Sequence, residues 1–191
     1  MFTVEVLLPR METRSLLEAV VVARQSLTLP EPPITLEGES ALLVFPDNRQ
    51  LRHVVTELAP KAVVVSGWQC DSSQELMDAL DALSHSQELI DAVVIDNISL
   101  FYWELRQLPT TSATAWYTNL NRHVQRLNSY GIPVVVTMMD HTIDSGYNGE
   151  FTEPDVTRWS DVSAVPVAFA ERFDKVVYIS TGTVVDMSRK S

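Results

Sequence analysis

The residues best suited to chemistry lie between Asp91 and Arg106, where an apolar run ends in an acid. Ala92 to Ile95 is short, uninterrupted and apolar, which is typical of a parallel strand buried on both faces. Asp96 follows this run directly. In open α/β sheets, ligands bind in the crevice beyond the carboxyl ends of the strands. Asp96 is therefore either a metal-facing carboxylate of the Walker B kind or a residue that caps the turn after the strand.

Other reactive side chains form no recognisable constellation. His53 and His123 fall within predicted helices, His85 falls near a helix end, and none has a Ser or Cys partner identifiable by spacing. His141 stands among acids without the spacing of a strong metal-ligand motif. Cys70 is the single cysteine, so neither an intrachain disulfide nor a thiol cluster is possible. The sequence predicts no metal, no cofactor and no catalytic triad.

The composition indicates one folded domain over residues 1–191. The chain is 46% hydrophobic and 20% charged, which is ordinary for a globular protein and argues against a membrane protein. Its 14 Lys and Arg against 25 Asp and Glu give a net charge of −11. Such a chain is a poor autonomous binder of nucleic acid unless its bases gather on one face, because binding relies on cations that neutralise phosphates. Met1 to Leu8 contains Glu5 and does not resemble a signal peptide, so the cytosol or nucleus is expected.

Strand and helix patterns alternate along most of the chain. This order predicts an α/β fold with a mostly parallel sheet flanked by helices and a C-terminal antiparallel hairpin. A capping box, Ser72 with Glu75, marks one helix start, and Gly131 marks a helix end. The predicted elements are strand Phe2–Leu8, helix Ser15–Ser26, strand Ala41–Phe45, helix Leu51–Leu58, strand Ala62–Val65, the helix after Ser72, strand Ala92–Ile95, helix Thr110–Gly131, strand Ile132–Met138, an acidic loop Asp140–Ser163, and the hairpin Lys175–Ile179 with Thr183–Asp186.

This order, together with two local segments, resembles the RecA-like core of the eukaryotic recombinase (Rad-fifty-one) paralogues. More narrowly, the chain resembles the X-ray-repair cross-complementing-two type and the fungal Shu-complex subunits. The resemblance is carried by the strand and turn 93–99 and by the aromatic run Phe101-Tyr102-Trp103. Ala41 to Leu58 is a second, weaker match, and the likeness spans most of the chain.

The resemblance implies a nucleotide site, and this chain departs from it. A phosphate-binding loop reads G-x-x-x-x-G-K-[ST], so that backbone N–H groups and Lys can surround the phosphates. The corresponding segment, residues 8–15, lacks both glycines, has Thr13 and Arg14 before Ser15, and contains a proline and a glutamate. Asp96 stands where the Walker B acid would be, and Asp47 lies near the acid that orients the attacking water. Without a phosphate cradle, the resemblance implies a pseudo-ATPase that holds no cofactor.

The loop 140–163 corresponds to a segment that contributes to single-stranded DNA binding in the recombinases. Here it carries six acids, which would repel phosphates. Three aromatic side chains of the loop, Tyr147, Phe151 and Trp159, could stack on bases, pack the loop down or meet a protein partner, and the sequence leaves these alternatives open. Arg158, the loop's one Lys or Arg, is a further candidate for contact with DNA or a partner.

The function implied by the resemblance is a non-catalytic subunit that promotes recombinase filament assembly on single-stranded DNA during homologous recombination repair. Its expected partner is another RecA-like paralogue in a heterodimer, with a SWIM-domain protein as a further partner, in the nucleus and without a membrane. Phe101, Tyr102 and Trp103 are the candidate partner-binding residues. Two alternatives remain: an active ATPase that uses Arg14 and Ser15 in a divergent loop, and a RecA-fold Elongator subunit acting on transfer RNA. The aromatic run argues against the second of these.

Overall fold

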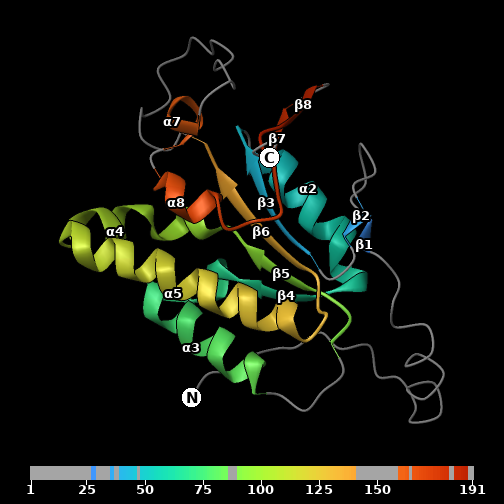
Figure 1. The fold of residues 1–191 in the computed structure, drawn as a ribbon, viewed down its shortest axis with the longest axis horizontal. Helices are drawn as coiled ribbons and strands as arrows, with labels where there is room; N and C mark the ends of the chain where they lie inside the picture. Colours follow the sequence, from blue (N-terminus) through green and yellow to red (C-terminus); the bar gives the residue numbers. More distant parts are fainter. Residues whose placement is uncertain are drawn as a thin grey trace.

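A six-stranded sheet forms the centre of the computed structural model, which describes residues 27–28, 35–36, 39–46, 48–85, 90–140, 159–163, 165–180 and 183–188 (Figure 1). The strand order is β4-β5-β6-β3-β7-β8, and every pair is parallel except the hairpin β7–β8. This confirms the predicted α/β class, its mostly parallel sheet and its C-terminal hairpin. The strands are β3 (Ser40–Phe45), β4 (Val63–Ser66), β5 (Val93–Asp96), β6 (Val134–Met139), β7 (Lys175–Ser180) and β8 (Thr183–Asp186), and a separate pair is formed by β1 (Leu27–Thr28) and β2 (Thr35–Leu36).

Helices cover both faces of the sheet. The connection from β3 to β4 crosses the sheet in one direction, and those from β4 to β5, β5 to β6 and β6 to β7 cross it in the other. Right-handed crossovers then require α2 on one face and α3, α5 and α8 on the other, as Figure 1 shows. The helices are α2 (Asn48–Leu58), α3 (Ser73–Ser84), α4 (Tyr102–Gln107), α5 (Thr110–Ser129), α7 (Trp159–Val162) and α8 (Val167–Ala170), with 3-10 turns η1 (Ala59–Lys61), η2 (Gly67–Gln69) and η3 (Ile98–Phe101).

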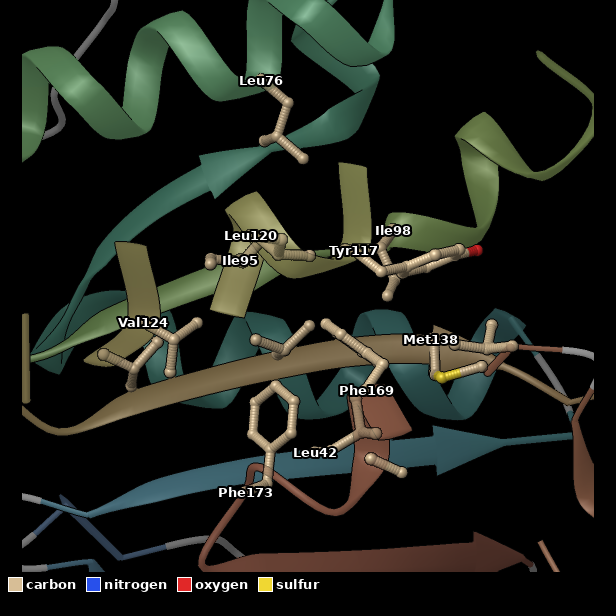
Figure 2. Close-up of a cluster of buried hydrophobic side chains, with 14 of the residues drawn as sticks. Leu42, Leu76, Ile95, Ile98, Tyr117, Leu120, Val124, Met138, Phe169 and Phe173 are labelled. Atoms are coloured by element: carbon tan, nitrogen blue, oxygen red, sulfur yellow. The ribbon is translucent and has the colours of Figure 1, made fainter. Parts of the chain in front are cut away.

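The core consists of two apolar layers separated by the sheet. Strand β3 contributes to both, because Leu42 faces α3, α5 and α8 whereas Leu43 faces α2. Figure 2 shows the first layer, where Leu42 and Ile95 of the strands meet Leu120 of α5 and Phe169 of α8. Burial of a leucine or phenylalanine side chain of this kind contributes roughly 1.5–3 kcal/mol. Burial on both faces explains why these strands read as unbroken apolar runs.

Two predicted helix boundaries are confirmed. Ser72 Oγ accepts a hydrogen bond from the Glu75 N–H at 3.3 Å, as a capping box requires. The Glu75 carboxylate reaches one residue further back than the motif predicts, to the Asp71 N–H at 2.7 Å. Gly131 follows α5 with φ +77°, a left-handed conformation that glycine adopts without strain.

Several predicted features fall outside the described residues. They include the strand Phe2–Leu8, the helix Ser15–Ser26 and the greater part of the acidic loop. Among the residues that are described, no helix is both long and apolar enough to cross a membrane.

Candidate functional site

The sheet has a switch point between β3 and β6. The chain leaves β3 for α2 on one face, whereas α8, which leads from β6 into β7, packs on the opposite face. In open α/β sheets, the crevice for ligands lies beyond the carboxyl ends of two such neighbouring strands. In the sequence, residues 46–48 after β3 include no glycine, and Pro46 has no N–H to offer a ligand.

The protein's own groups bridge the strand ends at this point. The Asp140 N–H, after β6, donates to the Phe45 carbonyl at 2.9 Å. The Asp140 carboxylate is buried and accepts a hydrogen bond from the Tyr178 hydroxyl of β7 at 3.1 Å. Asp140 is therefore a structural link between three strands, and not the solvated start of an acidic loop that the sequence predicts.

Asp96 lies at the end of β5, between polar side chains of the neighbouring strands. It is 7% exposed. Ser66 Oγ of β4 donates to Asp96 Oδ2 at 3.2 Å, and Thr137 Oγ1 of β6 lies 3.5 Å from Asp96 Oδ1. Burial raises the pKa of Asp96, outweighing these hydrogen bonds and the nearby charge of Arg52, which lower it. Both carboxylate oxygens thus have partners within the sheet.

The residues after Asp96 fix the turn that leaves β5. Asn97 adopts φ 63°, a left-handed conformation that asparagine tolerates better than most residues. Its Oδ1 accepts the Ser99 N–H at 3.2 Å, and Ser99 Oγ accepts the Met139 N–H at 2.8 Å. The arrangement ties the ends of β5 and β6 together. The side chain that caps this turn is that of Asn97, whereas Asp96 bonds to Ser66 and Thr137 on the neighbouring strands. Within the described ranges, no group of three or more His, Cys, Asp or Glu side chains could hold a metal ion.

The aromatic run is divided between core and surface. Phe101 is only 4% exposed and its ring lies 6.1 Å from that of Trp116, so the prediction that it reaches a partner surface is wrong. The turn η3 directs this ring inward, against α5. Tyr102 is half-buried, and Trp103 is 54% exposed. Only these two members of the predicted partner-binding set are available at the surface.

Of the four predicted loop residues, only Trp159 is described. It is half-buried, packs against the core and donates its indole N–H to the Val165 carbonyl at 2.7 Å. Through these contacts, Trp159 packs helix α7 against the core. The other predicted site residues lie outside the described residues: Thr13, Arg14, Ser15, Asp47, Tyr147, Phe151 and Arg158.

One surface group was not predicted from the sequence. Trp68, in the turn after β4, is 51% exposed, and the Arg52 guanidinium carbon lies 4.8 Å from the centroid of its ring. In the sequence, a tryptophan directly after a predicted strand is only a weak sign of a surface site. Arg52, its partner 16 positions earlier on α2, is marked by no sequence pattern. Arg106 lies 5.7 Å from the Tyr102 ring and 5.6 Å from the Trp103 ring.

Comparison with known proteins finds similarity among solved structures. No family model matches the sequence, and no curated protein matches it. A solved structure described as "Crystal structure of the RadB recombinase" is similar over 74% of this chain and 74% of its own, with 13% sequence identity and a TM-score of 0.47.

Proposed function

We propose that this chain is a non-catalytic RecA-like recombinase paralogue that acts in a heteromeric nuclear complex. In this proposal, the complex promotes recombinase filament assembly on single-stranded DNA during homologous recombination repair. Another RecA-like paralogue is the direct partner, and a SWIM-domain protein is a further member. The order of strands and helices on which the sequence resemblance rests is present in the described residues from Ser40 onward, which supports the proposal.

The observation that carries the non-catalytic assignment is the engagement of both strand-end acids. Asp96 is bonded to Ser66 and lies beside Thr137, and Asp140 is bonded to Tyr178. An acid that holds magnesium or directs water must present oxygen atoms to the ligand. Here Asp96 directs both oxygens, and Asp140 its Oδ2, to neighbouring strands. The segment 8–15, which the resemblance matches to the phosphate-binding loop, has no glycine to bring backbone N–H groups toward phosphates, and residues 46–48 after β3 have none either.

Two measurements test the absence of nucleotide chemistry. The purified chain should hydrolyse no ATP above background, and ATP with magnesium should leave its melting temperature unchanged. A ligand at a hundred times its dissociation constant would stabilise the protein by about 2.7 kcal/mol, a clearly visible shift. Turnover that Asp96→Ala abolishes would establish the divergent ATPase instead.

Co-purification from native extract tests the assembly. Recovery of a RecA-like paralogue in a complex of two or a few subunits is the expected result. Recovery of Elongator subunits in a ring would replace the proposal with the transfer-RNA alternative. The two outcomes differ in both subunit identity and native mass, so mass spectrometry of the intact complex separates them.

A further inference from the structure

Two exposed tryptophans at the carboxyl edge of the sheet each have an arginine beside the ring. Trp68 in η2 is 51% exposed and is contacted by Arg52 of α2 at 4.8 Å. Trp103 in α4 is 54% exposed and is contacted by Arg106 of the same helix at 5.6 Å. A guanidinium over an indole face is a cation–π contact. Each pair therefore combines a flat aromatic surface with a positive charge at the protein surface.

The fold holds the two pairs on one rigid base. Their elements follow neighbouring strands, since η2 follows β4 and η3 with α4 follows β5. Gly67 packs so closely on the turn after β5 that an added Cβ would lie 3.1 Å from the Asp96 carbonyl oxygen. Glu104, next to the second tryptophan, accepts hydrogen bonds from the Ser73 N–H at 2.9 Å and the Ser73 hydroxyl at 2.7 Å. These contacts hold η2 and α4, the elements that carry the two tryptophans, at the same edge of the sheet.

The other two tryptophans of the chain serve packing. Trp116 is buried and donates its indole N–H to the Ser73 carbonyl at 3.1 Å, and Trp159 donates to the Val165 carbonyl. Buried tryptophans usually satisfy this N–H in the same way. Trp68 and Trp103 belong to neither apolar layer of the core, so their rings are available for contacts at the surface. Stacking on a flat ligand, with the arginines beside it, fits that position.

We propose that this edge binds single-stranded DNA, with bases stacked on Trp68 and Trp103 and phosphates paired with Arg52 and Arg106. This inference rests on the proposed function and names the surface through which the chain would contact the DNA. Stacking on aromatic rings tolerates any base sequence, because every base has a π face. The net charge of −11 opposes binding at long range. At physiological salt, charges beyond about 8 Å are largely screened, so the nearest groups decide close contact. Among the acids near the two arginines, Asp96 is buried close to Arg52, and Glu104, on the helix of Arg106, has its carboxylate bound to Ser73.

Titration of the purified full chain with an oligo(dT) strand tests the site. Intrinsic tryptophan fluorescence reports stacking, and anisotropy of a labelled strand reports affinity. Replacing either Trp68 or Trp103 with Ala should weaken binding about 5- to 150-fold, the equivalent of one lost stacking contact. The corresponding Trp→Phe variants should retain most of the affinity.

Two arginine variants test the phosphate contacts. Arg52→Gln and Arg106→Gln should each reduce the slope of log K against log salt concentration by about 0.7. Tyr130→Ala removes an aromatic ring that is 61% exposed beyond α5 and should have no effect.

Two results would overturn the inference. The first is that the wild type does not bind oligo(dT), or that the wild type and both alanine variants bind it with equal affinity. The other is loss of a co-purifying protein from those variants with oligo(dT) affinity unchanged, which would make the edge a protein interface, where tryptophan and arginine are also enriched. The titration needs no partner, so its outcome is independent of the complex. Stacking on both rings without a recombinase paralogue in native extract would leave this site standing and reject the proposed function.

Discussion

Glu104 should be worth far more to stability than its exposed position suggests. Its carboxylate accepts two hydrogen bonds from Ser73, at 2.9 Å from the N–H and 2.7 Å from the hydroxyl. Ser73 is buried and is the first residue of α3, where a negative charge also interacts favourably with the helix dipole. Hydrogen bonds to charged groups contribute about 1.5–3 kcal/mol each when buried, and solvent around Glu104 reduces this value. We expect Glu104→Ala to lower the free energy of unfolding by about 1–2 kcal/mol.

Urea denaturation measures this loss, and thermal melting should show it as a decrease of roughly 2–8 °C for a chain of this size. Asp78→Ala is the matched control, because Asp78 is an exposed acid of α3 that accepts a hydrogen bond from Gln74 one turn earlier. Its loss should cost less than about 0.5 kcal/mol. A double-mutant cycle with Ser73→Ala isolates the hydroxyl bond. If Glu104→Ala destabilises the protein no more than Asp78→Ala, the contact between α4 and α3 contributes nothing and the reasoning fails.

Two further predictions concern titration. Burial raises the pKa of Asp96, so the folded chain holds the proton of this carboxyl more tightly than the unfolded chain does. The protonated carboxyl therefore favours the folded state at low pH, and this stabilisation is lost as pH rises through the folded pKa. Asp96→Asn should therefore be more stable than the wild type in urea at pH 7, with the difference shrinking toward pH 4; a less stable variant would contradict this. Burial also raises the pKa of Tyr117 to about 12. Stability should fall above pH 10, and Tyr117→Phe should remove the last step of the ultraviolet absorbance titration; a last step unchanged in the variant would show that another tyrosine titrates there.

Local sequence patterns were sufficient for the elements of the sheet. The apolar runs at Ala41–Phe45 and Ala92–Ile95 predicted β3 and β5, because strands buried on both faces need no polar alternation. The capping box at Ser72 and the glycine at 131 predicted helix ends, because both act over a few residues. These signals depend on backbone chemistry that is local in sequence.

The site could not be read in the same way. Whether an aromatic residue in a run faces inward depends on what packs above it, and Trp116 of α5 decides this for Phe101. Asp140 reads as one acid among six, and only its contact with Tyr178, 38 positions away, identifies it as structural. The pairing of Trp68 with Arg52 likewise arises only when α2 and the end of β4 come together. Tertiary contacts between distant residues carry the information in each case.

The position of β3 in the sheet has a consequence for how the chain reaches its folded state. This strand comes early in the sequence, yet its two neighbours are β6 and β7, and Ser40 at its start bonds to Asp174, 134 positions later. Such non-local pairing slows folding, because the chain loses the entropy of closing a long loop before the stabilising contacts form. During synthesis, one side of the buried strand β3 stays unpaired until β7 has emerged. The topology therefore requires that the unpaired edge of β3 be shielded from association with other chains until β7 pairs with it.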